Sequence, residues 1–248
     1  MLLHGFTDTH RTWEPALPAL ERRHEVLAPT LAGHAGGPPL PEALSAASLA
    51  DAVEAAVDEA GFETAHFAGN SLGGFVALQL AERGRARSVV AFAPAGGWEE
   101  GDPSLTATLD LQQELLRTLA TAAPQAGAIA ATAAGRRRAT ALLTDHGEDL
   151  PADLVAHIVL GAAACRGAGA MLAFAGTPGA YALDLARITC PVRVVWGTAD
   201  RLLPWPGAAA RFRRGLDAEW VELDGVGHAP QLDDPATTAE LIRGYSGR

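Results

Sequence analysis

The sequence contains no lysine, and all 19 residues counted as lysine or arginine are arginine. This absence excludes chemistry that depends on a primary amine on a long side chain. A Schiff base, a pyridoxal phosphate anchor and the phosphate-binding Walker A loop each require a lysine. We therefore expect a protein that works without any of these groups.

Cysteine and net positive charge are also scarce. Cys165 and Cys190 are too few and too far apart in the sequence for a disulfide framework or a zinc site, and they fit a reducing cytoplasm. The formal net charge of −10 argues against a nucleic-acid partner, because affinity for phosphate backbones comes from clustered cations.

Long apolar runs are missing as well. No segment approaches the ~18 apolar residues that a membrane span requires, and the chain does not start with a basic segment followed by an apolar one. We expect a cytoplasmic protein with no membrane partner.

The sequence does contain enough apolar residues for one sizeable core, since 48% of its 248 residues are hydrophobic. Short apolar runs alternate with segments of helical periodicity. This pattern indicates an α/β fold, with a mostly parallel sheet and helices on both faces. The expected strands are Met1 to Leu3, Glu25 to Ala28, Thr64 to Ala68, Ser88 to Ala93, Pro191 to Trp196 and Glu219 to Leu223.

Capping residues and apolar spacing predict three helices near these strands. Ser48 and Asp51 have the spacing of a capping box, and a second helix is expected over residues 72–83. Asp234 followed by Pro235 predicts the capped start of a final helix.

Between residues 98 and 186 the sequence changes to alanine-rich, leucine-spaced stretches that proline and glycine interrupt. We expect about four short helices here, inserted between two parts of the sheet. This divides the chain into a catalytic core of residues 1–97 and 187–248 and a helical cap of residues 98–186. The run of residues 136–138, all arginine, is expected to be a solvated helix end.

The strongest motif is the segment Gly69-Asn70-Ser71-Leu72-Gly73-Gly74. It lies directly after an expected strand and directly before an expected helix. In that position a G-x-S-x-G sequence predicts a nucleophile elbow, where glycines relieve crowding around a strained turn that exposes the serine hydroxyl. Ser71 is therefore the predicted nucleophile.

A serine nucleophile requires a base and a group that orients the base, and both follow later in the chain. Asp200 follows the strand expected to end at Trp196, and His228 follows the strand expected to end at Leu223. Open parallel sheets place their sites in loops at the carboxyl ends of the strands. We therefore predict that Ser71, His228 and Asp200 act together.

Acyl transfer also needs backbone N–H groups that face the developing oxyanion, each worth roughly two to three powers of ten in rate. His4-Gly5-Phe6 lies at the end of the first expected strand. The amides of Phe6 and Leu72 are the predicted donors of this oxyanion hole, and His4 is expected to shape the loop.

These motifs resemble the α/β-hydrolase superfamily, and within it the capped serine hydrolases. The matching residues are His4-Gly5-Phe6, the elbow at residues 69–74, Trp196-Gly197-Thr198-Ala199-Asp200 and Gly227-His228. The resemblance covers the chain except the expected cap. It implies a mostly parallel sheet, an inserted helical cap and a triad of Ser71, His228 and Asp200.

The start of the chain departs from the family pattern. Family members normally have two further strands before the one that ends in His-Gly. Either this N-terminal hairpin is absent and the strand Glu25 to Ala28 forms a sheet edge, or the start of the sequence is truncated. An uncovered edge favours association, so a monomer or a homodimer is expected. Thr30 stands where the family usually has an aspartate, which predicts a local hydrogen-bond difference without loss of activity.

The predicted function is hydrolysis of a small, apolar carboxylic ester through an acyl-enzyme, with a small-molecule substrate and no metal or organic cofactor. The candidate residues of the substrate pocket are Trp98, Trp205, Asn70 and Arg166.

Several alternatives stay open. The C–C bond hydrolases of keto acids resemble this chain through Asn70, and Arg166 would then bind the keto-acid carboxylate. Cofactor-free perhydrolases and menaquinone-pathway lyases share the His-Gly-Phe start. Epoxide hydrolases and haloalkane dehalogenases need a carboxylate nucleophile at the elbow, which Ser71 disfavours. From a different class, a non-catalytic, ligand-binding member of the fold is also considered.

Overall fold

Five parallel strands form one sheet. The structure is a computed structural model that describes residues 1–246. The strands are β1 (Leu2–Leu3), β2 (Ala65–Asn70), β3 (Ala86–Phe92), β4 (Val192–Gly197) and β5 (Glu219–Leu223), and they follow one another across the sheet in sequence order. All neighbouring pairs are parallel. Five of the six expected strands are thus confirmed.

The sixth expected strand, Glu25 to Ala28, does not form. Its backbone is irregular, and the carbonyl of Leu27 accepts a hydrogen bond of 2.9 Å from the amide of Leu2. Because β1 is only two residues long, it offers too little backbone for a ladder of several hydrogen bonds. The strand predicted at this edge of the sheet was wrong.

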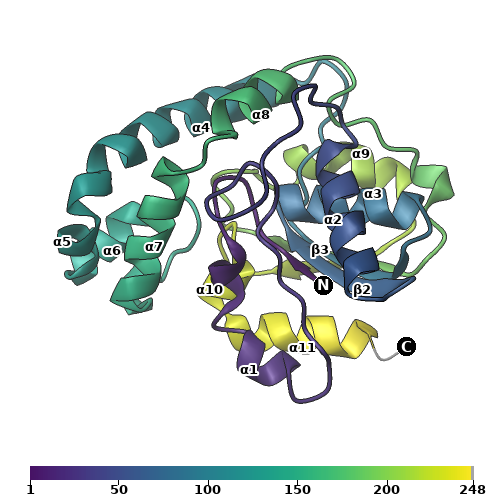
Figure 1. Ribbon diagram of the computed structural model, residues 1–248, viewed down its shortest axis with the longest axis horizontal. Coiled ribbons are helices and arrows are strands. Elements are labelled where there is room, and N and C mark those ends of the chain that lie inside the picture. The colour runs from purple at the N-terminus through teal and green to yellow at the C-terminus, as the bar shows by residue number, and fades with distance from the viewer. Residues whose placement is uncertain (247–248) are drawn as a thin grey trace.

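Six α-helices lie outside the segment between β3 and β4 in the described part of the chain. They are α1 (Leu17–Leu20), α2 (Ser48–Glu59), α3 (Leu72–Glu82), α9 (Ala210–Gly215), α10 (Pro230–Asp233) and α11 (Pro235–Ser246). A 3-10 turn, η1, covers His10–Trp13. Figure 1 shows α2 and α3 on one side of the sheet and α1 and α11 on the other.

Of the two helix caps expected from the sequence, one forms and the other does not. Asp234 accepts a hydrogen bond of 3.0 Å from the amide of Thr237 at the start of α11, as expected for a capping residue. The capping box predicted at Ser48 was wrong, because Ser48 is already helical and Ala47 precedes α2. The Ser48 hydroxyl instead accepts a hydrogen bond of 2.9 Å from the amide of Ser45.

Both faces of the sheet are covered in its centre, which explains why the end of β3 and most of β4 are apolar and buried without alternation, whereas the edge strand β5 carries exposed glutamates. In β3, Val89 and Ala91 belong to the core that also contains Val57 of α2. Val90 and Phe92 belong to the opposite core, together with residues of α1 and α11. The sheet is therefore a middle layer, and its carboxyl edge is left to carry a site.

Five further α-helices, called the β3–β4 helices below, lie between those two strands. They are α4 (Pro103–Ala122), α5 (Ala126–Ala130), α6 (Ala133–Ala139), α7 (Ala152–Ala163) and α8 (Ala168–Ala175). Figure 1 shows them as a group at one side of the sheet and its flanking helices. The long α4 differs from the short helices expected here, because no proline or glycine interrupts it after its first residue.

No single helix within residues 1–246 is long and apolar enough to cross a membrane. Only together do α7 and α8 have the length and apolar composition of a membrane span, and the two helices are bent by 69° at the break between them.

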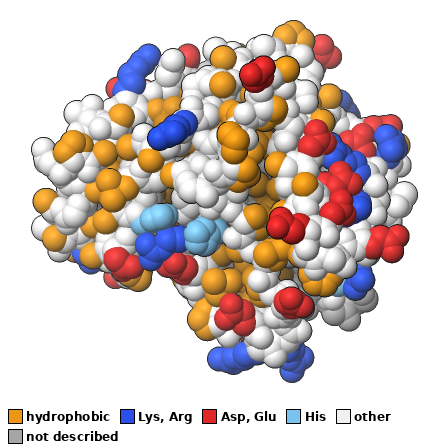
Figure 2. All heavy atoms as spheres, in the orientation of Figure 1, with side chains coloured by type: hydrophobic (Ala, Val, Ile, Leu, Met, Phe, Trp, Pro, Cys, Tyr) orange, Lys and Arg blue, Asp and Glu red, His pale blue; other side chains and the backbone are white. Residues whose placement is uncertain are grey.

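Arginine and acidic side chains pair on the surface beside α2. Arg83 forms ion pairs of 2.7 Å with Asp51 and 2.6 Å with Glu54, and Arg85 pairs with Asp58. Figure 2 shows basic and acidic side chains interspersed on the side of the molecule where α2 lies. Exposed pairs of this kind contribute about 0 to 1 kcal/mol each, so they affect the surface more than the fold.

Candidate active site

Ser71 lies at a sharp turn between β2 and α3, with backbone angles φ 55° and ψ −117°. A non-glycine residue with positive φ stores strain of roughly 1 to 3 kcal/mol, which the surrounding structure must hold in place. At two glycines the backbone lies very close to another backbone segment. A Cβ atom on Gly69 would lie 2.3 Å from the carbonyl oxygen of Gly73, and one on Gly73 would lie 2.3 Å from that of Leu3. This is the geometry of the predicted elbow.

The predicted base and its orienting acid are in direct contact. His228 Nδ1 donates to Asp200 Oδ2 at 2.7 Å, and both side chains are buried. The other carboxylate oxygen of Asp200 accepts hydrogen bonds from the amides of Leu202 (2.9 Å) and Leu203 (2.8 Å). Because Nδ1 carries the proton, Nε2 is the acceptor, and within residues 1–246 it has no hydrogen-bond partner.

The turn after β1 approaches Ser71 from the other side. A Cβ atom on Gly5 would lie 3.4 Å from the Cβ of Ser71. His4 holds this turn, since its Nδ1 donates to the carbonyl of Gly5 at 2.8 Å and its Nε2 accepts from the amide of Leu31 at 2.9 Å. Burial lowers the pKa of His4 well below its usual range, so the ring stays neutral and keeps the tautomer that this pair of bonds requires.

The amides of Phe6 and Leu72 are the predicted oxyanion donors. Leu72 is the first residue of α3, so its N–H belongs to the free groups at a helix N-terminus. In the described chain, residues 1–246, neither amide donates a hydrogen bond to another backbone group. Both donors therefore lack a competing backbone acceptor.

Two cavities meet at Ser71. The aromatic cavity holds about 760 Å³ of space, including its open part, and its lining includes Phe75, Trp98, Leu109, Met171, Phe174 and Tyr181. The His228 cavity holds about 990 Å³, including its open part, and is lined by His228 together with apolar side chains of α4 and α7. Phe6, Ser71 and Gln112 line both cavities. Ser71 thus lies where the two cavities meet, which is called the junction below, with one cavity on either side of it.

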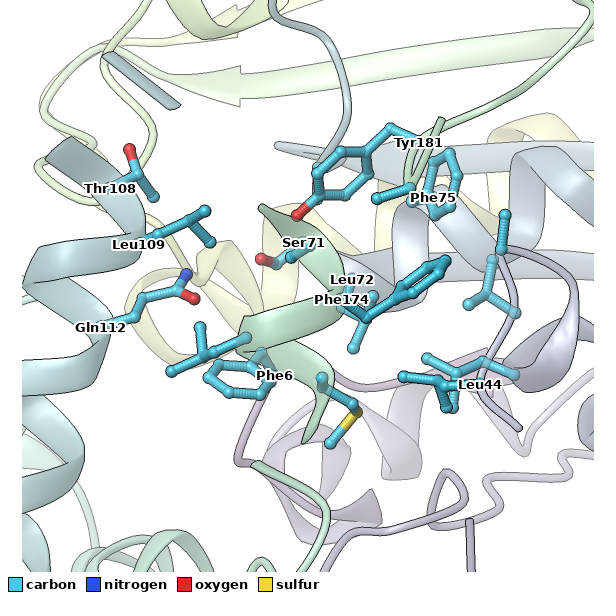
Figure 3. Close-up of a pocket in the computed structure, with 18 of the residues that line it drawn as sticks. Phe6, Leu44, Ser71, Leu72, Phe75, Thr108, Leu109, Gln112, Phe174 and Tyr181 are labelled. Carbon is cyan, nitrogen blue, oxygen red and sulfur yellow. The ribbon is translucent and has the colours of Figure 1, made fainter. Parts of the chain in front are cut away.

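Figure 3 shows the aromatic cavity around Ser71. The hydroxyl of Tyr181 and the amide of Gln112 point toward Ser71, and Phe6 lies below it in this view. The Tyr181 ring packs edge-on against Phe75, with ring centroids 5.3 Å apart. Burial raises the pKa of Tyr181 to about 12, so its hydroxyl stays protonated and can donate a hydrogen bond.

Sequence reasoning missed Tyr181, Gln112 and Asp8, which also line the cavities. Gln112 and Tyr181 lie in the segment between β3 and β4, where no motif singles out one position. Asp8 lies two residues after Phe6 of the His-Gly-Phe motif, and this closeness to the expected oxyanion loop is the only feature of the sequence that could have identified it.

The predicted pocket residues lie in different places. Trp98 lines the aromatic cavity, and Asn70 lines the His228 cavity. Trp205 lines neither cavity; its ring packs against Trp196 of β4 and Trp220 of β5, with centroid distances of 5.7 and 5.9 Å. Arg166 lines a separate surface hollow beside residues 33–40. The pocket role predicted for Trp205 and Arg166 does not fit this placement.

Asn70 uses its amide to hold the loop of His228. Its Nδ2 donates to the carbonyl of His228 at 2.8 Å and to that of Phe92 at 3.3 Å. Its Oδ1 accepts from Gln231 Nε2 at 3.3 Å, and the same nitrogen donates to Thr12 Oγ1 at 3.1 Å. The side chain next to Ser71 in the sequence therefore fixes the distance between the elbow and the base.

The turn that follows α6, residues 141–145, is bound to the loops of the site and is called the latch below. The amide of Ala229 donates to the carbonyl of Leu143 at 2.8 Å. Asp233 accepts from the amides of Asp145 (3.0 Å) and Gly227 (2.7 Å), and also from the hydroxyl of Thr144. The latch therefore contacts the chain on both sides of His228.

Arg201 attaches the loop of Asp200 to the same latch. Its guanidinium donates to the carbonyl of Ala141 at 3.1 Å and to Asp145 Oδ1 at 2.5 Å. The loops that carry the predicted acid and base are thus tied to one short segment.

The arginine run forms the last turn of α6, and Arg137 and Arg138 are exposed, as expected for a solvated helix end, whereas Arg136 is half-buried. Arg136 donates hydrogen bonds of 3.0 Å to the carbonyls of Ala130 and Glu148, and Arg137 pairs with the Glu148 carboxylate. Arg138 lines the His228 cavity. The first two side chains are engaged because the turn before α7 folds back onto α6, a contact that the local sequence does not predict.

Within residues 1–246, no group of three or more His, Cys, Asp or Glu side chains is arranged to hold a metal ion.

Comparison with known proteins covers nearly the whole chain. A family model described as "Alpha/beta hydrolase family" matches residues 1–241. The chain is 35% identical over 222 residues to the epoxide hydrolase EphH of Mycobacterium tuberculosis, a match that covers 82% of this chain and 95% of the relative. It is 32% identical over 258 residues to pimeloyl-[acyl-carrier protein] methyl ester esterase of Aromatoleum aromaticum, covering 98% of this chain and 95% of the relative.

Among solved structures, a bacterial membrane phospholipase A superposes with a TM-score of 0.75 and 22% identity, over 98% of this chain and 76% of that chain. At this level of identity the likeness establishes the fold alone.

Proposed function

Because the chain belongs to the alpha/beta hydrolase family, we propose that it is a serine hydrolase that cleaves a carboxylic ester through an acyl-enzyme. The observation that carries the proposal is the junction at Ser71, where a strained elbow serine shares a cavity with His228, whose ring is bound to Asp200.

In the first step, Ser71 Oγ attacks the ester carbonyl carbon and His228 Nε2 accepts the hydroxyl proton. Asp200 accepts the Nδ1–H bond at 2.7 Å, which keeps Nε2 in its acceptor form and stabilises the cation that forms. The carbonyl oxygen becomes an oxyanion, and the amides of Phe6 and Leu72 are the groups that bind it.

The intermediate then collapses. The C–O bond to the alcohol breaks, and the alkoxide takes the proton held at His228 Nε2 and leaves as an alcohol. Water attacks the acyl carbon while His228 Nε2 accepts a proton from it. The bond from that carbon to Ser71 Oγ then breaks, Oγ takes the proton from His228, and the carboxylic acid is released.

The cavities support an apolar substrate. The aromatic cavity is lined by aliphatic and aromatic side chains from both the sheet region and the β3–β4 helices. We propose that residues 98–186 act as a cap that supplies this lining. An acyl chain placed there would be desolvated by these side chains, which favours binding in proportion to its apolar area.

Epoxide opening is the second candidate, because one relative is named as an epoxide hydrolase. If Ser71 opened an epoxide, the product would be an alkyl ether of serine. An ether has no carbonyl for water to attack, so turnover would stop after one cycle, whereas a carboxylate nucleophile would give a cleavable ester. The serine at the elbow therefore disfavours this reaction, and incubation with styrene oxide is expected to yield no diol.

The structure weakens the case for cleavage of C–C bonds in keto acids. Arg166 lies in a separate hollow and is not available to bind a carboxylate beside Ser71. The side-chain amide of Asn70 is hydrogen-bonded to the carbonyl of His228.

The direct test is labelling with a fluorophosphonate probe, followed by turnover of p-nitrophenyl esters of increasing acyl length. We expect wild-type protein to be labelled at Ser71 and to hydrolyse the esters. Ser71→Ala should lose labelling and on the order of 10⁶ in kcat.

Ser45→Ala is the matched control, because Ser45 also lines the aromatic cavity but lies outside the elbow. It should keep both labelling and turnover. A folded wild-type protein that neither reacts with the probe nor hydrolyses any ester would refute the proposal and favour a ligand-binding role.

A further inference from the structure

Asp8 lies in the turn that carries the Phe6 amide, and its side chain lines the His228 cavity. The turn is closed by a hydrogen bond of 3.3 Å from the Asp8 amide to the Gly5 carbonyl, and Thr7 adopts a positive φ of 63° within it. One carboxylate oxygen of Asp8 accepts from the amide of Thr9 at 2.8 Å. The carboxylate is therefore held in place by the Thr9 amide, on a residue that lines the same cavity as Ser71 and His228.

This carboxylate has no counter-charge. Within residues 1–246 it forms no ion pair, and the other ionisable side chains that line the same cavity are His228 and Arg138. Arg138 is solvent-exposed. On the neighbouring elements, His157 is engaged by Thr9 and Arg11 is paired with acidic side chains. The group that balances Asp8 is thus missing from the protein itself.

Burial is the main cause of the raised pKa of Asp8, which is about 6, while hydrogen bonds from Thr9 and Thr12 oppose the rise. At neutral pH most of the molecules therefore carry an ionised carboxylate in a largely apolar cavity. A desolvated charge without a partner is unfavourable, so a cation that enters the cavity gains from pairing with it.

The proposed mechanism assigns the two halves of the substrate to the two cavities. His228 must protonate the departing alkoxide, so the alcohol half has to lie on the side of Ser71 where His228 lines the wall. The acyl half then lies in the aromatic cavity, whose lining does not include His228.

We propose that Asp8 determines specificity for the alcohol half, by binding a cationic group such as a quaternary ammonium on the leaving alcohol. A quaternary ammonium is weakly hydrated and carries apolar methyl groups, so it suits the part of the cavity that is lined by leucine, isoleucine and alanine side chains, while Arg138, the cationic residue of the lining, is solvent-exposed. This inference rests on the proposed ester hydrolysis and goes beyond it by naming the leaving group.

The test compares two esters of butyrate that differ in one atom. One has choline as its alcohol, and the other has 3,3-dimethylbutanol, in which carbon replaces the charged nitrogen. At pH 8 the wild-type kcat/KM should favour the choline ester by on the order of tenfold, the effect of one partly desolvated charge pair. The preference should shrink below pH 6 as Asp8 becomes protonated, and Asp8→Asn should remove it at every pH.

Taking the ratio of the two substrates cancels changes in His228, because both reactions use the same base. Asp217→Asn, which removes an exposed carboxylate outside both cavities, is the control and should keep the wild-type ratio. Equal kcat/KM values for the two esters in the wild type, or an unchanged preference in Asp8→Asn, would overturn the inference while leaving ester hydrolysis intact.

Failure of the proposed function would give a different result, with neither ester cleaved. In that case calorimetric binding to Ser71→Ala still decides the inference. Tighter binding of the choline ester, lost in Ser71→Ala combined with Asp8→Asn, would support the role of Asp8, and equal binding of both esters would contradict it.

Discussion

Replacing Asp8 with asparagine should stabilise the protein, and by an amount that depends on pH. The folded state raises the pKa of Asp8 from 3.8 to about 6 because the carboxylate is buried. Between these two values the folded state binds the proton more tightly than the unfolded state, so the stability of the wild type falls as the pH rises through this window. Asparagine cannot ionise and escapes this loss, while its oxygen can still accept from the Thr9 amide.

The size of the effect follows from the two values. One pH unit of change in a pKa is worth about 1.4 kcal/mol, so at pH 7 and above Asp8→Asn should gain about 3 kcal/mol in the free energy of unfolding. At pH 5 the gain should be about 1.5 kcal/mol, and below pH 3.8 it should vanish. Urea unfolding followed by circular dichroism across this range measures the difference.

Two results would refute this reasoning. A difference between Asp8→Asn and wild type that is the same at every pH would show that the ionisation of Asp8 is not linked to folding. A loss of stability at pH 7 would show that the carboxylate has a partner that offsets its burial. The exposed Asp217→Asn should leave the pH profile unchanged.

Three further predictions concern the geometry of the site. Thr7→Gly should raise the free energy of unfolding by about 1 kcal/mol, since glycine adopts φ 63° without strain, and it should lower kcat because the Phe6 amide is less firmly placed. Urea unfolding measures the first effect and ester turnover the second. A loss of stability would contradict this prediction. Asn70→Ala should destabilise the protein by about 1 to 3 kcal/mol in the same assay, since the carbonyl of His228 loses its buried donor, and an unchanged stability would mean that water replaces the amide. Leu109→Trp should narrow the aromatic cavity and reduce kcat/KM for p-nitrophenyl decanoate by about tenfold relative to the acetate, and an equal effect on both esters would argue that the acyl chain lies elsewhere.

The fold was largely predictable, because each of its parts has a local signature. The elbow at Ser71 combines glycines with an apolar strand before it and a helix after it, and the loops of Asp200 and His228 follow apolar strands. The α/β-hydrolase fold that these motifs implied is confirmed by the family match. The strand expected at residues 25–28 failed because pairing depends on the length of its neighbour β1, which local sequence does not reveal.

The two cavities at Ser71 were not predictable in the same way. Gln112 and Tyr181 meet at Ser71 only after α4 and the chain before β4 fold over the sheet. Asp8 was passed over because a carboxylate in a turn normally faces solvent, and its cavity exists only through packing against α4 and α7. Trp205 was expected at the pocket because it is large, yet such rings serve the core equally well, as its contact with Trp196 shows.

The latch at residues 141–145 limits how this enzyme can be engineered or diversified by exchange of parts. The carbonyls of Ala141 and Leu143 and the polar groups of Asp145 are acceptors and donors for the loops of Asp200 and His228. A foreign helical segment grafted between β3 and β4 would change both cavities at Ser71, but it would also remove the hydrogen-bond partners of these loops. A chimera would therefore have to keep the native latch and replace only the helices around it, so that the loops of Asp200 and His228 stay in place.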